Sequence, residues 1–118
     1  MVRSMIIAAA LAIVAWPAAA RAHAVVVEAR PAVDTIVPVG GLDIRLQFNS
    51  RIDAQRSRLT LQNPDRQAVA VMPAIAEPNV LAARSRIDRQ GRWTLRWQVL
   101  SRDGHITRGE IPFIAGTR

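Results

Sequence analysis

The strongest strand pattern in the chain is Trp93-Thr94-Leu95-Arg96-Trp97-Gln98-Val99-Leu100. Large apolar side chains alternate with mostly polar ones, and this period of two predicts a half-buried β-strand. At this spacing Trp93 and Trp97 lie on the same face as Leu95 and Val99. We therefore expect both tryptophans to pack in a core rather than to form a platform for a ligand.

Shorter segments of the same kind lie on both sides of this strand. The expected strands, in chain order, are residues 24–29, 42–48, 58–62, 68–72, a short strand within 80–87, 93–100 and 110–115. The expected connections include Gly40-Gly41, residues 73–79 with two prolines, and the polar residues 101–109. Pro112 suggests an edge or bulge position in the last strand. About seven short strands predict an all-β fold, an antiparallel sandwich or barrel.

The first 22 residues are typical of a secretory signal peptide. Arg3 precedes the apolar run from Met5 to Ala15, which is too short for a bilayer span of about 20 residues. Ala20-Arg21-Ala22 then offers small residues at the two positions that a signal peptidase recognises. We expect cleavage after Ala22, which leaves one domain of 118 − 22 = 96 residues, 23–118, with no other apolar run of membrane length.

The composition excludes several classes of function. The chain has no cysteine, so it has neither disulfides nor thiolate metal ligands. Its formal charge of +7 becomes +5 without Arg3 and Arg21, and every basic residue is an arginine. These arginines are scattered over expected polar strand faces and loops, which favours a solvated surface over a nucleic-acid site.

The chain has only two histidines, His23 and His105. Cleavage after Ala22 would make His23 the first residue, which offers its α-amine and its imidazole Nδ1 to one metal ion. A second imidazole would add a third nitrogen and a carboxylate a further donor, and such tetragonal nitrogen and oxygen donors suit Cu(II). Zn(II) accepts imidazole and carboxylate as well.

Asp103-Gly104-His105 follows the tryptophan strand and can supply the remaining donors. A glycine between the two permits a tight backbone, so the Asp103 and His105 side chains can be aimed at one point. Taken alone this triplet is weak, because Asp-Gly is a common turn signal. Ser101 beside His105 lacks the base and orienting group that a nucleophile needs.

The chain resembles the CopC family of periplasmic copper-binding proteins. The resemblance covers the chain from His23 onward and rests on His23-Ala24, Arg30-Pro31-Ala32, Leu46-Gln47-Phe48-Asn49, the block from Trp93 to His105, and Gly109 with Phe113. It implies a Greek-key β-sandwich of immunoglobulin-like or cupredoxin-like type that carries Cu(II) in the periplasm. It also implies that His23 binds by amine and imidazole, His105 by imidazole and Asp103 by carboxylate. The partner that it implies is a separate inner-membrane copper transporter of the CopD type.

Two departures from the family pattern matter. Some members have a Cu(I) site in a methionine-rich segment, whereas Met72 is the one methionine after the expected leader, so we expect no Cu(I) site here. The family often has an acidic residue soon after the second-strand phenylalanine, where this chain has Asn49-Ser50. Asp53 is a candidate substitute.

The leading hypothesis is a non-catalytic Cu(II) carrier or buffer in copper resistance or uptake. One alternative is an oxidative enzyme with a histidine-brace copper, which needs an open coordination position and a broad substrate face. The other is a structural sandwich that binds no metal.

Overall fold

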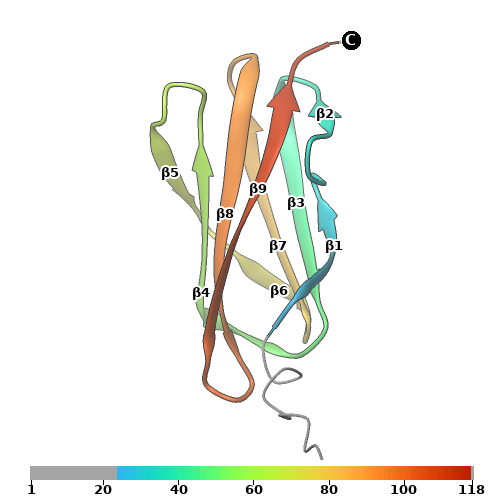
Figure 1. Cartoon of the computed structure of the whole chain (residues 1–118), viewed down its shortest axis with the longest axis vertical. Coiled ribbons are helices and arrows are strands. Elements are labelled where there is room, and N and C mark those ends of the chain that lie inside the picture. The colour runs from blue at the N-terminus through green and yellow to red at the C-terminus, as the bar shows by residue number, and fades with distance from the viewer. Residues whose placement is uncertain (1–23, 118) are drawn as a thin grey trace, which may run out of the picture.

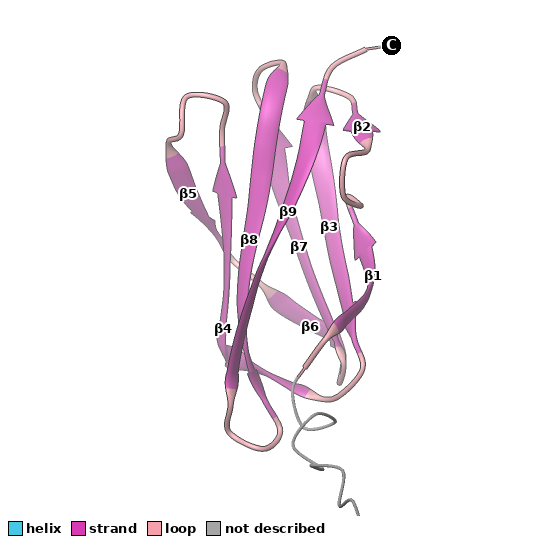
Figure 2. Cartoon of the chain, viewed as in Figure 1, coloured by secondary structure: helices cyan, strands magenta, loops and turns pink. Residues whose placement is uncertain are grey.

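The computed structural model describes residues 24–117, and within this range the chain forms two β-sheets packed face to face (Figure 1). The four-stranded sheet contains, in spatial order, β1 (Val26–Arg30), β3 (Gly40–Phe48), β7 (Val80–Ile87) and β6 (Ala74–Glu77). The five-stranded sheet contains, in spatial order, β2 (Ile36–Val37), β9 (Ile106–Ala115), β8 (Gly91–Ser101), β4 (Ile52–Gln62) and β5 (Ala68–Val71). Between residues 24 and 117 every element is a strand (Figure 2), and no helix there is long and apolar enough to cross a membrane.

The connections make the fold a Greek-key β-sandwich, as the resemblance to the CopC family implies. The chain visits the second sheet briefly at β2, between β1 and β3, and changes sheets again between β3 and β4, between β5 and β6, and between β7 and β8. Strands distant in sequence therefore become neighbours, as β3 and β7 do in one sheet and β4 and β8 in the other. The strand pairs are antiparallel, as predicted, except at one edge, where the short β2 pairs with β9 in parallel.

The core lies between β3 and β8, whose alternating apolar side chains face each other across the two sheets. On β3 these are Leu42, Ile44, Leu46 and Phe48, and on β8 they are Trp93, Leu95, Trp97 and Val99. Neither tryptophan is more than 8% exposed, and the Trp97 ring meets Phe48 edge to face with centroids 5.2 Å apart. The expectation that both tryptophans pack in the core is confirmed.

Gly109 of β9 makes room for one of these tryptophans. It pairs with Trp97 across the β8–β9 ladder, and a Cβ atom at position 109 would lie 2.4 Å from Cζ2 of the indole. No side chain fits there without moving the ring or the backbone. A glycine is therefore required at this position for the hairpin to close over the core.

Residues 24–117 form nine strands rather than about seven, because the sequence pattern does not predict two short edge strands, β2 and β6. Residues 73–79 were expected to form a loop, but β6 runs through Ala74–Glu77 between Pro73 and Pro78. It is the outer strand of its sheet and pairs only with β7, so the prolines at its ends disrupt no second ladder. The two residues of β2 are too few to show a period.

The predicted loops are also too long. β9 begins at Ile106, so the expected connection 101–109 shrinks to residues 102–105. β3 begins at Gly40, which has a φ of 128°, and pairs there with Ile87. β4 begins at Ile52 rather than at residue 58, with a bulge between Asp53 and Arg58 that hides its period.

Pro112 was expected at an edge or bulge, but β9 lies between β2 and β8 in its sheet. Position 112 is nevertheless outside the short ladder with β2, which reaches only Ile114 and Ala115. The Pro112 carbonyl accepts a hydrogen bond from the Asp34 amide at 2.8 Å, on the side away from β8. Since the N–H and C=O of one strand residue point to the same side, the missing N–H of Pro112 costs β8 no hydrogen bond.

Candidate metal centre

The hairpin between β8 and β9 brings Asp103 and His105 together at one end of the sandwich. Ser101 closes the turn, because its amide donates to the carbonyl of His105 at 2.8 Å and its carbonyl accepts from the Gly104 amide at 3.0 Å. Gly104 has a φ of 88°, a backbone conformation that glycine adopts at low cost. The tight turn that the sequence predicts is therefore present, and both polar side chains lie on it.

The Asp103 carboxylate is held by hydrogen bonds from three groups. Oδ1 accepts from the buried hydroxyl of Ser101 and, at 3.1 Å, from the amide of His105. Oδ2 lies 2.6 Å from Nδ1 of the His105 ring. The hydrogen bond from Ser101, aided by those from His105, lowers the pKa of Asp103 from 3.8 to about 2. Asp103 is thus an anion at any pH at which imidazole can bind a metal.

The contact with Asp103 decides which nitrogen His105 can offer. Its side chain is 62% exposed, and Nδ1 is engaged by the carboxylate. A metal ion bound to His105 in this arrangement would use Nε2. Metal-ligating histidines commonly donate their other ring N–H to a carboxylate, which fixes the tautomer and orients the ring.

His23 and the predicted leader lie outside the described residues. The residue that follows His23, Ala24, has a defined position in the fold. Ala24 is fully buried in the core. Val25 is fixed to the residue that follows β3, since its amide donates to Oδ1 of Asn49 at 2.8 Å and its carbonyl accepts from the Asn49 amide at 2.9 Å. Asn49, which stands near the position where the family often has an acid, therefore anchors the first strand.

The start of the described chain and the Asp103 loop lie at the same end of the molecule. Val26 pairs with Phe48 at the end of β3, and Ser101 pairs with Ile52 at the start of β4, only a short connection further on. Figure 1 shows the start of β1, the β3–β4 connection and the β8–β9 hairpin together at the bottom of the view. Two of the three predicted ligands meet in the structure, and the chain enters the fold at their end.

Asp53 does not join this pair. Its Oδ1 accepts from the amide of Gln55 at 2.9 Å and caps the bulge of β4. Among residues 24–117 no group of three histidine, cysteine, aspartate or glutamate side chains could hold a metal ion. The structure thus gives no support to Asp53 as a substitute ligand.

Ser101 helps to shape the candidate site, a role that the sequence pattern did not predict. Its hydroxyl contacts Asp103 and, at 3.0 Å, the carbonyl of His105. These contacts show a role in shaping the loop. In the sequence only its position two residues before Asp103 pointed to this role. Serines are common at such positions in loops, so the position alone predicts no contact.

Comparison with known proteins gives the family. The sequence profile of the CopC domain matches residues 26–116. The chain belongs to the CopC family. A sequence search among curated proteins gives no match.

Solved CopC-type structures share the fold. CopC from Methylosinus trichosporium OB3b is 22% identical, with a TM-score of 0.71 over 79% of this chain and 93% of that one. PcoC, a methionine-rich copper resistance protein from Escherichia coli, is 22% identical, with a TM-score of 0.60 over 80% of this chain and 100% of that one. This chain is not methionine-rich: residues 24–117 include a single methionine, Met72, and its side chain is exposed.

Proposed function

We propose that this CopC-family chain is a periplasmic Cu(II)-binding protein that buffers copper or carries it in resistance or uptake. The proposed ligands are the α-amine and Nδ1 of His23, Nε2 of His105 and the carboxylate of Asp103. The observation that carries the proposal is the meeting of Asp103 and His105 at the end of the sandwich where Ala24 enters the core. Copper resistance of the similar PcoC supports the choice of metal.

Coordination by Asp103 involves a movement of its side chain. The two nitrogens of an imidazole point to opposite edges of the ring, so Oδ2 cannot contact both Nδ1 and a metal at Nε2. Binding of Cu(II) by Asp103 therefore requires the carboxylate to turn from Nδ1 toward the ion. Residues 102–105 are exposed, while the side chain of Asp103 is 26% exposed, so the turn would take the carboxylate out of its present contacts toward the solvent.

The donor set predicts Cu(II) rather than Cu(I). Nitrogen and oxygen donors in a tetragonal arrangement suit Cu(II), whereas Cu(I) prefers thiolates and thioethers. The chain has no cysteine and, from Ala24 onward, one methionine. We further propose a carrier rather than an oxidative enzyme, because Asp103 would occupy a coordination position that such an enzyme keeps open.

Export follows from the predicted leader, and so does the proposed partner. Cleavage after Ala22 would release the α-amine of His23 in the periplasm. A carrier there needs a membrane protein that accepts copper from it or supplies copper to it. We propose a separate transporter of the CopD type for this role.

The experiment that tests the proposal is a Cu(II) titration of the chain that begins at His23, at pH 7, against the same chain acetylated at its N-terminus. The free amine and Nδ1 close one chelate ring, so acetylation should weaken binding by at least about tenfold, the size of effect expected when a metal-site group is lost. Equal binding by the two forms would contradict the chelate. The variant Asp53→Asn is a matched control, since it removes a carboxylate at the same end of the fold and should leave the affinity unchanged.

A further inference from the structure

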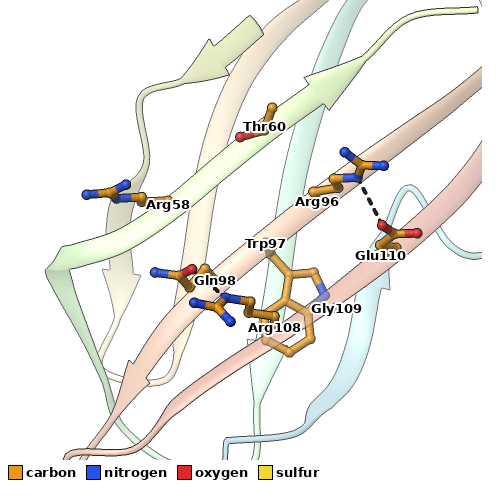
Figure 3. Close-up of a pocket in the computed structure, with 8 residues that line it drawn as sticks. All are labelled: Arg58, Thr60, Arg96, Trp97, Gln98, Arg108, Gly109 and Glu110. Carbon is orange, nitrogen blue, oxygen red and sulfur yellow. Dashed lines mark hydrogen bonds and ion pairs between the residues drawn. The ribbon is translucent and has the colours of Figure 1, made fainter. Parts of the chain in front are cut away.

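The outer face of the five-stranded sheet carries a hollow of about 490 Å³ between β4, β8 and β9 (Figure 3). Two cross-strand rows line it. The first row places Arg58, Gln98 and Arg108 in register, and the second places Thr60, Arg96 and Glu110 in register. All six alternate with the core residues of their strands, so their side chains belong to the outer face.

The hollow has an excess of positive charge. Nε of Arg96 pairs with Glu110 at 3.0 Å, and Nε of Arg108 donates to Oε1 of Gln98 at 2.7 Å, as the dashed lines of Figure 3 mark. Between residues 24 and 117 no carboxylate pairs with Arg58 or Arg108. Three guanidinium groups against one carboxylate leave the hollow with a net charge of 3 − 1 = +2.

The outer face of the other sheet is better balanced. There Arg84 of β7 pairs with Asp43 of β3 at 3.0 Å, and Arg45 of β3 pairs with Glu77 of β6 at 3.4 Å. Arg86 on the same face of β7 has no acidic partner among residues 24–117. In the hollow two arginines without an acidic partner lie in one row, so part of the surplus positive charge of the chain is gathered there.

We propose that this hollow binds an acidic segment of a partner polypeptide. Neighbouring strands lie about 4.8 Å apart, so the backbones of Arg58 and Arg108 are separated by about 10 Å across β8. This separation suits two carboxylates placed three residues apart on one segment in the polyproline II conformation, better than one small oxyanion. That conformation has three residues per turn and rises about 3.1 Å per residue, so both carboxylates lie on the same side about 9 Å apart. Each guanidinium can then bind its carboxylate with two parallel hydrogen bonds.

The remaining side chains of the hollow favour a peptide over other anions. Thr60 and Gln98 supply both donors and acceptors, which match the amides of a polypeptide backbone. Glu110 accepts hydrogen bonds from amide N–H groups, whereas it would repel a uniformly anionic polymer. A concave surface also admits peptide side chains, while a flat anionic bilayer would meet only its rim.

The hollow is close to the candidate metal centre. Gln98 precedes Ser101 by three residues on β8, a distance of about 10 Å along an extended strand. A partner held there would have part of its surface beside the Asp103 loop. The binding of an acidic segment does not depend on copper, so a failure of the copper proposal would leave it standing.

A nuclear magnetic resonance titration of the metal-free protein tests the proposal. The probes are the capped peptide Gly-Glu-Gly-Gly-Glu-Gly, its counterpart with glutamine for glutamate, inorganic phosphate, and phosphatidylglycerol vesicles. We expect the glutamate peptide alone to shift backbone amides of β4, β8 and β9 around Thr60, Gln98 and Gly109. Shifts confined to other parts of the chain, or equal binding of the glutamine peptide, phosphate or vesicles, would overturn the proposal.

Paired variants separate the hollow from the general charge of the protein. The double variant Arg58→Gln/Arg108→Gln should weaken binding of the glutamate peptide about five- to tenfold, the loss of two exposed ion pairs. Arg84→Gln/Arg86→Gln removes the same charge from β7 on the opposite face and should change the affinity by less than about twofold. Equal weakening by both pairs would show a nonspecific charge effect and would contradict a site in the hollow.

Discussion

Asp103 makes more contacts than the Asp-Gly-His pattern alone predicts. The spacing of the triplet predicted that Asp103 and His105 could be aimed at one point, and Oδ2 of Asp103 does lie 2.6 Å from Nδ1 of His105. The pattern could not predict that the carboxylate also accepts from Ser101, because that contact depends on how the hairpin closes. The hydrogen bonds of the loop therefore prepare an ionised carboxylate next to an oriented imidazole.

The acid titration of Asp103 should depend on Ser101. In the wild-type protein its carboxyl titrates with a pKa of about 2, and Ser101→Ala should raise this pKa toward 3.8 because the hydroxyl bond is the largest cause of the shift. The pKa of the carboxyl can be followed by nuclear magnetic resonance. The control is Ser50→Ala, which removes a buried hydroxyl that has no hydrogen-bond partner among the described residues. An unchanged midpoint in Ser101→Ala would contradict the assigned cause.

The lowered pKa also sets how the loop responds to acid. A carboxyl whose pKa is lower in the folded than in the unfolded chain stabilises the fold above the unfolded value, which is near 3.8. This contribution should be lost as the pH falls from about 4 through about 2, and should not change between pH 5 and 8. Urea unfolding at a series of pH values measures it. The stability advantage of the wild type over Asp103→Asn should shrink as the pH is lowered. An advantage that grew with falling pH would contradict the lowered pKa.

Replacement of Asp103 should weaken copper binding. Asp103→Asn keeps the shape of the side chain but removes its charge, whether the carboxylate binds the ion or orients His105. Loss of such a group should lower the Cu(II) affinity about 10- to 100-fold. A competition titration against a chelator of known affinity measures this, and wild-type affinity in the variant would exclude Asp103 from the site.

Among the elements, the β8–β9 hairpin carries both the strongest sequence signal and the candidate ligands. The alternation of residues 93–100 correctly predicted β8 and its buried tryptophans. The first half of β9 was missed, because Ile106–Gly109 follows a turn and has a glycine where the strand period calls for a side chain. A glycine is needed there because the Trp97 ring occupies the space of a side chain. This contact between strands therefore interrupts the alternation of side chains along β9.

Gly109→Ala should therefore destabilise the fold. The added Cβ would lie within 2.6 Å of three atoms of the Trp97 indole, and overpacking of this kind costs about 1–3 kcal/mol of the free energy of unfolding. Urea unfolding monitored by tryptophan fluorescence measures the loss. Gly41→Ala on the exposed side of β3 is the control, since nothing lies within 4 Å of its added Cβ, and it should change the stability by about 0.5 kcal/mol or less. Equal losses in both variants would contradict the packing role of Gly109.

For the whole molecule, the position of the candidate site depends on which strand ends lie side by side in the sandwich. The alternation of the strands predicted a sandwich or barrel, but their order in the sheets depends on long-range pairing that no local period contains. The Greek-key topology was predicted from the resemblance to the CopC family. The pairings of Val26 with Phe48 and of Ser101 with Ile52 place these strand ends at the same end of the sandwich. They bring the start of β1 to the Asp103 loop, so a donor just before Ala24 could complete the site. His23 itself remains a prediction from the sequence.

The electron spin-resonance spectrum of the chain that begins at His23, with one equivalent of Cu(II) at pH 7, tests this convergence most directly. We predict a single tetragonal Cu(II) species with coupling to three nitrogen donors, which loses one imidazole coupling in His105→Ala. A spectrum of hydrated copper, or one that His105→Ala leaves unchanged, would contradict a site shared between the N-terminal histidine and the loop.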